Sequence, residues 1–277
     1  EGWNIRIRRK KMLEPKYIVK FGEKLPEEAL AKPGEVSLNV SEFFFDTIQG
    51  EGRYLGTPAA FLRLQGCPVN CKWCDTAAVW NHGCRVSISW LLSEMERTGL
   101  ADKMLHSATS YHLVVTGGSP LLQQSALAIL FEKMSEEWKF VPFIEIENEC
   151  SLIPTQNIAR WISCWNNSPK LSNSGVPEER RVNLEACMRV EQLAGDYQAE
   201  CWWKFVVKDQ SDIDEIFKTY SGQFWSFNPW EVYLMPMGAS QEEYFQNRER
   251  VVELAIQNGF RYSPREHIAI WNQKTGI

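Results

Sequence analysis

The chain of 277 residues has a formal net charge of −5 at pH 7, and 44% of its residues are apolar. This apolar fraction is ordinary for a globular protein with a sizeable core, whereas the acidic balance argues against general nucleic-acid binding. No apolar run approaches the roughly 18 residues that span a bilayer, and no signal peptide is visible. We therefore expect a cytoplasmic protein without membrane association, whose eight cysteines are reduced.

The first 40 residues are predicted to be an irregular lead-in, because they are rich in Lys, Glu and Pro. We interpret residues 1–40 as an N-terminal extension and residues 41–277 as the main domain. The basic run at residues 6–11 is interpreted as a solvated arm, in preference to a segment that binds nucleic acid or an acidic partner.

Apolar strands then alternate with amphipathic helices along the chain. The predicted strands are 59–66, 111–118, 141–148, 159–170, 201–209, 231–238 and 266–271. The predicted helices are 87–100, 125–137, 211–220 and 241–259, and residues 171–181 are predicted to be a flexible loop. This alternation predicts an α/β fold with a mostly parallel sheet covered by helices.

Polar or glycine-rich segments follow several of these strands. They are the cysteine loop after residue 66, Thr116 to Gly118, Glu147 with Asn148, and Ser168 to Lys170. The carboxyl ends of parallel strands meet at one edge of a sheet, which is where the chemistry of such folds lies. We expect these segments to converge on one mouth.

The most informative segment is "GCPVNCKWCDT" (66–76), in which Cys67, Cys71 and Cys74 have the spacing C-x3-C-x2-C. Thiolates bind zinc, copper(I) or iron–sulfur clusters. A structural zinc site needs four ligands, and Cys84 or His82 would have to supply the fourth. A [4Fe–4S] cluster held by three cysteines leaves one iron open to a substrate or cofactor. The spacing alone favours the cluster, with zinc or unliganded thiols as alternatives.

This cysteine pattern, with Trp73 just before the third cysteine, resembles the radical S-adenosylmethionine (SAM) superfamily, in particular its members with a partial (β/α)6 barrel. More specifically, the chain resembles the 7-carboxy-7-deazaguanine synthase family. The matching motifs are "FDTIQGEG" (45–52), "GTPAAFLRLQGC" (56–67), "CKWCDT" (71–76), "VTGGSPLL" (115–122), "NSPK" (167–170), "KFVV" (204–207), "LMPMG" (234–238) and "HIAIWNQKTGI" (267–277).

The resemblance implies a lyase that converts 6-carboxy-5,6,7,8-tetrahydropterin to 7-carboxy-7-deazaguanine. In that family a radical derived from SAM takes hydrogen from C6, the ring contracts, ammonia leaves and SAM is re-formed; the product feeds the synthesis of queuosine and other 7-deazapurines. The cofactor carries the difficult chemistry, and the protein orients it and excludes water. The resemblance also implies a flavodoxin- or ferredoxin-type electron donor and a homodimer, to which Trp202 or Trp203 would contribute.

The metal ligands implied by the resemblance are Cys67, Cys71 and Cys74 for the [4Fe–4S] cluster and Thr76 for Mg2+. A single protein ligand suits Mg2+, which keeps most of its water. The residues alone favour a different role for Thr76, in which it or Asp75 caps nearby N–H groups. The other five cysteines lack metal-ligand spacing and are interpreted as small buried apolar side chains.

The resemblance also implies two groups of binding residues. For the pterin these are Ile48, Gln49, Gly50, Glu51, Arg63, Thr116, His267 and Ile277; for SAM they are Trp73, Gly117, Gly118, Glu147, Ser168 and Lys170. Most of these residues can be explained equally well without the resemblance. They would then be parts of a turn or a βα turn, a surface arginine, a loop lysine and a structural histidine.

One residue departs from the family pattern Gly-Gly-Glu-Pro, in which the glutamate commonly accepts a hydrogen bond from the SAM amino group. Here the sequence is Gly117-Gly118-Ser119-Pro120. We expect a carboxylate of the next strand to take over this contact. Glu145 and Glu147 are two residues apart and so share a face, and Glu147 lies nearer the mouth. The alternatives are the Ser119 hydroxyl or backbone carbonyls.

Two other functions compete with this interpretation. Small radical SAM activating enzymes share the cysteine spacing but act on a partner protein, and they lack the "TIQGEG" segment. A non-enzymatic module stabilised by zinc is the other alternative, and it would be colourless, whereas a cluster protein is brown.

Overall fold

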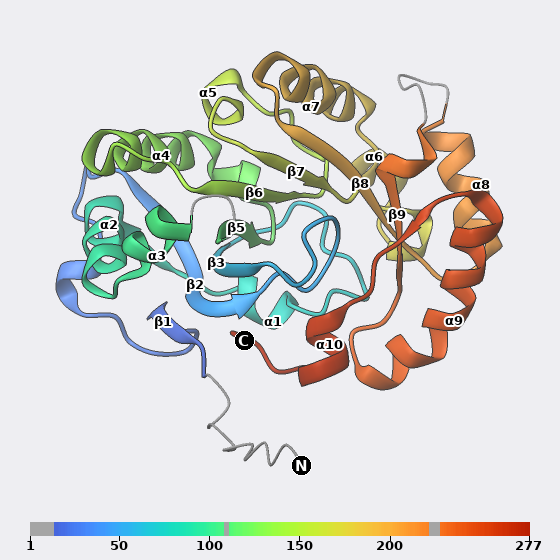
Figure 1. Ribbon diagram of the computed structural model, residues 1–277, viewed down its shortest axis with the longest axis horizontal. Coiled ribbons are helices and arrows are strands. Elements are labelled where there is room, and N and C mark those ends of the chain that lie inside the picture. The colour runs from blue at the N-terminus through green and yellow to red at the C-terminus, as the bar shows by residue number, and fades with distance from the viewer. Residues whose placement is uncertain (1–13, 108–110, 222–227) are drawn as a thin grey trace, which may run out of the picture.

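The computed structural model describes residues 14–107, 111–221 and 228–277 (Figure 1). The basic run at residues 6–11 lies outside the described residues. No helix in these three ranges is both long and apolar enough to cross a membrane.

A single curved sheet organises the molecule (Figure 1). Its order is β1-β2-β3-β5-β6-β7-β8-β9-β10, with β4 paired to β2. The strands from β3 to β10 in this order are parallel, and the pairs β1·β2, β2·β3 and β2·β4 are antiparallel. The strands are β1 Lys16–Val19, β2 Ser37–Ile48, β3 Pro58–Leu64, β4 Cys84–Ser87, β5 His112–Gly117, β6 Phe143–Asn148, β7 Cys164–Asn167, β8 Glu200–Val207, β9 Val232–Pro236 and β10 Arg261–Tyr262.

The longer helices begin and end at residues with clear capping roles. The Ser87 hydroxyl accepts the amide of Trp90 at the start of α2, Asp209 forms a capping box at the start of α8, and Gly259 ends α9 in the left-handed conformation. The helices are α1 Ala77–Trp80, α2 Ile88–Arg97, α3 Leu100–Ser107, α4 Gln124–Trp138, α5 Gln156–Ala159, α6 Glu178–Arg181, α7 Leu184–Tyr197, α8 Gln210–Thr219, α9 Gln241–Asn258 and α10 Glu266–Trp271, with short 3-10 turns η1 Glu27–Ala29, η3 Pro120–Gln123, η4 Ser172–Ser174 and η5 Pro229–Glu231.

The longer helices cover the outer face of the sheet (Figure 1), whereas α1 and α10 contribute residues to the cavity on the other side. One core packs α2, α4, α5 and α7 against strands β2 to β7, and a second core packs α8 and α9 against β8 and β9. In β3, Leu62 and Leu64 join the first core, so the alternation of strand side chains turns Arg63 to the other face. Polar residues inside apolar strands therefore mark the inner face.

The mostly parallel α/β fold, with a sheet that does not close, confirms the predicted architecture. Two sequence predictions are wrong. The lead-in is not irregular throughout, because β1 is part of the sheet and β2 begins at Ser37, so the expected boundary after residue 40 falls inside β2. The predicted last strand at 266–271 is the helix α10, since a short apolar run has no clear period.

Smaller differences concern the middle of the chain. The predicted strand 159–170 is confined to β7, because its first residues complete α5 and the turn after it. The predicted loop 171–181 contains η4 and α6, and its last residue, Arg181, is buried.

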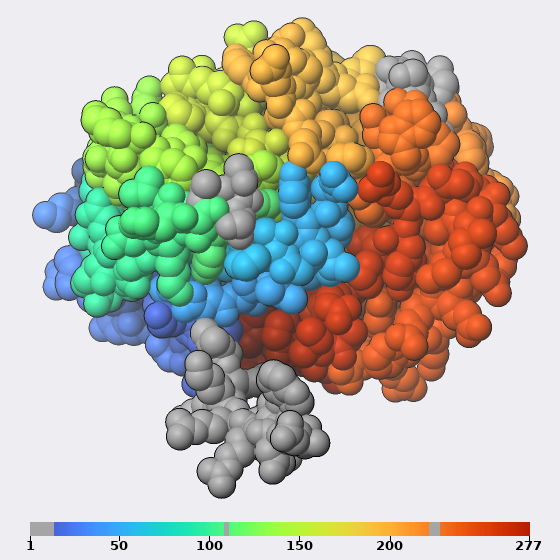
Figure 2. Space-filling model, in the orientation of Figure 1, coloured from blue at the N-terminus to red at the C-terminus, as the bar shows by residue number. Residues whose placement is uncertain are grey.

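The two ends of the described chain meet on one face. The Tyr17 hydroxyl in β1 donates a hydrogen bond of 2.6 Å to the carbonyl oxygen of Gly276. Figure 2 shows the dark red C-terminal residues beside the blue N-terminal part of the surface. Strand β1 therefore fixes residues 273–277 against the mouth of the sheet.

Candidate active site

A cavity opens at the carboxyl ends of the parallel strands. All the metal, substrate and cofactor residues expected from the sequence line it. They are Ile48, Gln49, Gly50, Glu51, Arg63, Cys67, Cys71, Trp73, Cys74, Thr76, Thr116, Gly117, Gly118, Glu147, Ser168, Lys170, His267 and Ile277. The expected convergence of these residues on one mouth is confirmed. The same cavity is lined by four charged residues to which we had assigned no binding role: Asp75, Glu149, Lys204 and Arg265.

The three cysteines lie on the loop between β3 and α1, packed with Val69, Val176 and Trp73. N–H groups point at two of the sulfurs. The Asn70 amide donates to Cys67 Sγ at 3.4 Å, and the Trp80 indole donates to Cys74 Sγ at 3.3 Å. Such N–H groups stabilise thiolates that bind a metal or a cluster.

The distances between ligand atoms test the zinc alternative. The three sulfur atoms do not all lie within 4.8 Å of one another. Among the described residues, the three potential ligands that do meet this distance are Glu51, Asp75 and His267. Ligands of one tetrahedral zinc would lie about 3.8 Å apart, given Zn–S bonds of about 2.3 Å. The wider spread of the sulfurs fits a multi-atom cluster. Cys84 lies in β4 and packs into the first core, away from this loop.

The thiols themselves are held in an apolar environment. Burial is the largest factor that raises the pKa of Cys67, and it raises the pKa of Cys71 to about 11. Lys170 opposes both shifts. Binding of a metal centre deprotonates coordinating thiols outright, so bare thiols in this loop are poor nucleophiles but suitable ligands.

Residues 171–181 cover the cysteine loop from the other side. The Trp73 indole donates to the backbone and side-chain oxygens of Asn173, both at 3.1 Å, and the Lys72 amide donates to the Ser174 carbonyl at 2.9 Å. Arg180 reaches the Pro68 carbonyl at 2.5 Å. This segment shields the thiols from water.

Gly117 and Gly118 are required by close backbone packing. A Cβ on Gly117, whose φ is +131°, would lie 2.2 Å from the Leu64 carbonyl oxygen, and one on Gly118 would lie 1.9 Å from that of Gly66. These contacts bring the end of β5 directly against the start of the cysteine loop. Gly50 has a comparable role, because its Cβ would lie 2.6 Å from the His267 ring.

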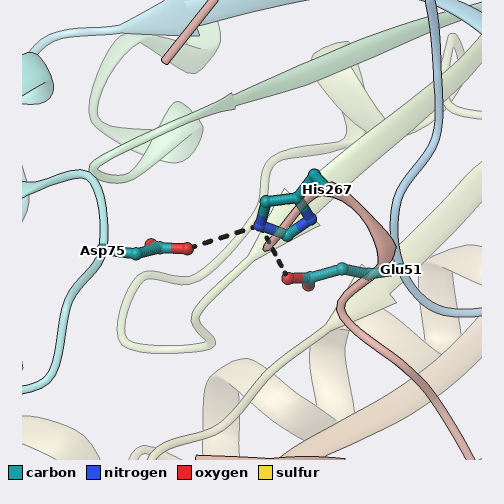
Figure 3. Close-up of side chains that lie close together, drawn as sticks. All are labelled: Glu51, Asp75 and His267. Atoms are coloured by element: carbon teal, nitrogen blue, oxygen red, sulfur yellow. Dashed lines mark ion pairs between the residues drawn. The ribbon is translucent and has the colours of Figure 1, made fainter. Parts of the chain in front are cut away.

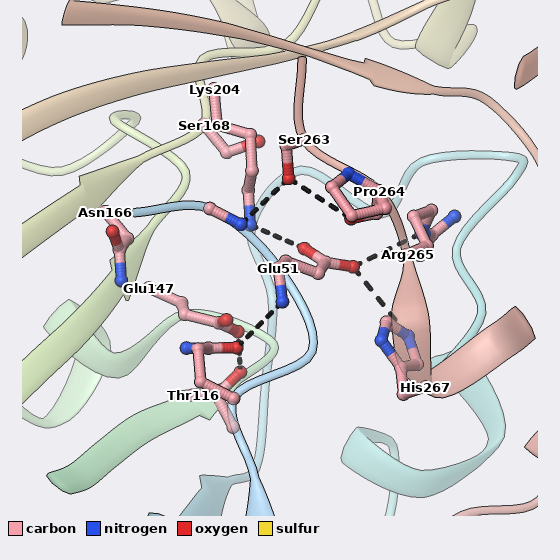
Figure 4. Close-up of polar contacts among 12 residues, drawn as sticks. Glu51, Thr116, Glu147, Asn166, Ser168, Lys204, Ser263, Pro264, Arg265 and His267 are labelled. Atoms are coloured by element: carbon pink, nitrogen blue, oxygen red, sulfur yellow. Dashed lines mark hydrogen bonds and ion pairs between the residues drawn. The ribbon is translucent and has the colours of Figure 1, made fainter. Parts of the chain in front are cut away.

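Glu51 is the centre of a charged network in the same cavity (Figures 3 and 4). Lys204 Nζ lies 2.5 Å from one of its carboxylate oxygens, and Arg265 Nε lies 3.2 Å from the other. Arg265 also bridges to Asp75, and His267 lies 3.7 Å from Glu51 and 3.5 Å from Asp75. Burial raises the pKa of Glu51, but Lys204, Arg265 and His267 outweigh it and bring this pKa to about 2.

The group Glu51, Asp75 and His267 resembles a metal site in its spacing, but Lys204 and Arg265 already neutralise its carboxylates (Figure 3). Two buried cations next to two carboxylates leave little attraction for a further cation. The network therefore presents a balanced set of charges, and a ligand can pair with either sign.

Gln49 and Arg63 are held by buried carboxylates. The Gln49 side-chain oxygen accepts the Glu51 amide at 3.2 Å, and its nitrogen donates to Glu145 at 3.3 Å. Glu145 is fully buried and also accepts from Asn166 at 2.6 Å. Arg63 Nε donates to Glu42 at 2.7 Å. Glu145 does not itself line the cavity, but it binds two residues that do, Gln49 and Asn166, and so orients Gln49.

Thr116 and Glu147 form a pair, since the threonine hydroxyl donates to the carboxylate at 2.5 Å (Figure 4). Lys170 Nζ donates to the carbonyl and hydroxyl oxygens of Ser168 at 2.7 and 2.8 Å. Ser119 is fully buried, and its hydroxyl has no hydrogen-bond partner in the described structure. It does not line the cavity.

Thr76 precedes α1 but makes no side-chain cap for it. Its hydroxyl lies 3.7 Å from Cys74 Sγ. The neighbouring Asp75 carboxylate binds Arg265. The capping role that the residues alone favoured is therefore not what the Thr76 side chain does here.

Comparison with known proteins identifies the family. A family model described as a 4Fe-4S single cluster domain matches residues 48–143. The 7-carboxy-7-deazaguanine synthase of Pyrobaculum aerophilum is 32% identical over 232 residues, which cover 84% of this chain and 94% of that protein. This chain belongs to the 7-carboxy-7-deazaguanine synthase family. The Escherichia coli K12 synthase is 29% identical over 237 residues, covering 80% of this chain and 94% of that one.

The structure supports the same assignment. The crystal structure of QueE from Escherichia coli has a TM-score of 0.57 and 25% sequence identity to this chain, and it covers 84% of this chain and 96% of its own. The expected family and radical SAM fold are confirmed, as is a lyase that uses a [4Fe–4S] cluster and SAM. The match to this family favours the synthase over the two alternatives, an activating enzyme and a module stabilised by zinc.

Two of the cavity residues that we did not predict could have been recognised from the sequence. Lys204 is a lysine inside the otherwise apolar strand β8, and such a residue turns to the face opposite the core. Glu149 directly follows the two strand carboxylates that alternation indicated. Arg265 precedes a segment taken for a strand, and nothing in its neighbours distinguished it.

Proposed function

We propose that this synthase converts 6-carboxy-5,6,7,8-tetrahydropterin to 7-carboxy-7-deazaguanine, releases ammonia and uses SAM catalytically. The observation that carries the proposal is one cavity with three cysteines at one end and a balanced set of buried charges around Glu51 at the other. The first end suits the cluster and SAM, and the second suits a ligand that has both a carboxylate and a hydrogen-bonding ring edge.

At the cysteine end, Cys67, Cys71 and Cys74 would hold the cluster, and Trp73, Gly117, Gly118, Ser168 and Lys170 would contact SAM. When bound, this pair supplies the radical that takes hydrogen from the substrate. The chain's own contribution is to orient SAM and exclude water, through the backbone of Gly117 and Gly118 and the cover formed by residues 171–181.

At the other end, Glu51 would accept hydrogen bonds from the N–H edge of the pterin. Its low pKa keeps it ionised, so both oxygens are acceptors. The substrate carboxylate would pair with a cation of the network, for which Arg63, Lys204 and Arg265 are the candidates. Gln49, Gly50, Thr116, His267, Ile48 and Ile277 would enclose the ring.

Mg2+ is the third proposed cofactor. Thr76 lines the cavity and its side chain does not cap α1, which leaves the hydroxyl available to a hard cation. A flavodoxin- or ferredoxin-type protein is the proposed electron donor. A homodimer and a cytoplasmic location, where thiols stay reduced, complete the proposal.

The test is anaerobic incubation of the reconstituted protein with the pterin, SAM, Mg2+ and a reductant, followed by mass analysis. We expect 7-carboxy-7-deazaguanine, about four irons per chain and a brown colour. Cys71→Ala should lose colour and product together, whereas Cys187→Ala, at a buried core position, should keep both. Product from a colourless Cys71→Ala protein would refute the proposal.

A further inference from the structure

Glu149 is a buried carboxylate that the proposed function does not use. It follows β6 directly, is 5% exposed and lines the active-site cavity. One of its oxygens accepts the hydroxyl proton of Ser151. The other, Oε2, is buried and has no hydrogen-bond partner among the described residues.

Glu149 also has no cationic partner within ion-pair distance in the described ranges, unlike Glu51 and Asp75, which line the same cavity. Glu51 pairs with Lys204, and Asp75 pairs with Arg265. A buried charge without a partner is costly. A cation from outside the chain would remove this cost, since Glu149 lines the cavity in which such a ligand would bind.

Glu149 lies at the cysteine end of the cavity. Its charge, after burial, contributes to the raised pKa of Cys67, whereas Lys170 lowers that pKa. An anion and a cation therefore both lie within electrostatic range of the first cysteine. Together they complement a zwitterion, such as an amino-acid group with its ammonium and carboxylate.

We propose that Glu149 accepts a hydrogen bond from the α-ammonium group of SAM, with Lys170 serving the SAM carboxylate. The inference rests on the proposed use of SAM and names the residue that binds its ammonium group. Two other candidates are less suitable. Ser119 does not line the cavity. Glu147 accepts one hydroxyl proton, as Glu149 does, but it has no buried oxygen without a partner in the described structure.

The first experiment compares SAM affinity in three reconstituted anaerobic proteins by calorimetric titration: the parent, Glu149→Gln and the matched Glu147→Gln. The loss of a hydrogen bond to a charged group predicts about a 10- to 150-fold weaker affinity for Glu149→Gln. Glu147→Gln should bind SAM within about two-fold of the parent. The reverse order would overturn the inference and assign the contact to Glu147.

A second series identifies the ligand group. S-adenosylhomocysteine keeps the ammonium group but lacks the sulfonium charge, so Glu149→Gln should weaken its binding by the same factor. An analogue of SAM without the α-amino group should bind the parent and Glu149→Gln equally. If Glu149→Gln weakens the analogue as much as it weakens SAM, the carboxylate does not contact the ammonium group.

Iron content and circular dichroism show whether each variant holds its cluster and fold. If Glu149→Gln loses the cluster, Glu149→Asp is used in its place, because the shorter side chain keeps the charge but moves it away from the ligand. We expect Glu149→Asp to bind SAM several-fold more weakly than the parent and to prefer SAM over the analogue less strongly. The inference would be overturned if Glu149→Asp bound SAM as tightly as the parent and preferred SAM over the analogue as strongly. Failure of the parent itself to bind SAM would instead contradict the proposed function.

Discussion

Glu51 shows how much of the site depends on single charged contacts. It binds Lys204 and Arg265 in the absence of substrate, and both cations are nearly buried. Glu51→Gln would leave Lys204 without its partner, and breaking a buried pair in this way costs about 3–5 kcal/mol. We expect a lower urea midpoint for the cluster-bearing variant.

The double variant Glu51→Gln/Lys204→Met is the control, because it removes both members of that pair. It should recover much of the lost stability. A double variant as unstable as Glu51→Gln alone would show that the ion pair is not the cause.

The pH dependence of this effect has a definite sign. The pKa of Glu51 in the folded protein is about 2, below its ordinary 4.5. Its contribution to stability is therefore full above about pH 4.5 and is lost as the pH falls towards 2. The difference in urea midpoint between the parent and Glu51→Gln should stay constant from pH 8 to pH 5. A difference that shrinks between pH 7 and pH 5 would contradict the low pKa.

Thr76 provides a test of the proposed metal. Mg2+ should raise the turnover rate, and Thr76→Ala should weaken this response about 10-fold, as loss of supporting metal contacts does. Thr76→Ser, which keeps the hydroxyl, is the matched control and should respond like the parent. A parent rate that does not change with Mg2+ would remove Thr76 from the metal site.

Most of these residues could be located from the sequence, because they follow strands or belong to family motifs. Their partners could not. The orientation of Gln49 depends on Glu145, and that of Arg63 on Glu42, and both contacts cross between strands. Such pairs depend on strand register, which motifs do not specify.

At the scale of elements, residues 171–181 also show that contacts between distant segments could not be predicted from the sequence. Their composition predicted a flexible loop, yet they bind the cysteine loop through Asn173, Ser174 and Arg180. No helix was predicted at α7 and no strand at β2. Most of the parallel strands and the helices α2, α4, α8 and α9 were predictable from period and capping residues. The α10 helix was not, because six residues with an apolar run fit a strand equally well.

Asn173→Ala tests this cover. Asn173 accepts from the Trp73 indole and donates to the Val206 carbonyl at 2.8 Å. Loss of both side-chain contacts, each contributing about 1 kcal/mol, should loosen the cover and raise the rate of cluster loss in air several-fold. Bleaching of the brown absorbance measures this rate. Ser172→Ala, which alters a contact to Glu215 on the outer side, should bleach like the parent.

At the scale of the whole molecule, the curved sheet places the cysteine loop and the charged network in one cavity, where Arg265 joins them by binding Asp75. Strand β1 adds to this arrangement by holding residues 273–277 at the mouth, through Tyr17 and Gly276. The parallel α/β architecture was predictable from alternating strands and helices. The antiparallel β1·β2·β4 edge was not, since β1 lies in the segment interpreted as a lead-in and no strand was predicted at β2 or β4.

The most direct test of the account is the ratio of product formed to SAM consumed. It is measured anaerobically with the reconstituted protein, carboxytetrahydropterin, Mg2+ and a reductant. A synthase of this family that re-forms SAM should make many molecules of 7-carboxy-7-deazaguanine for each SAM lost. A one-to-one yield of product and 5′-deoxyadenosine, or cleavage of SAM without this product, would contradict the account.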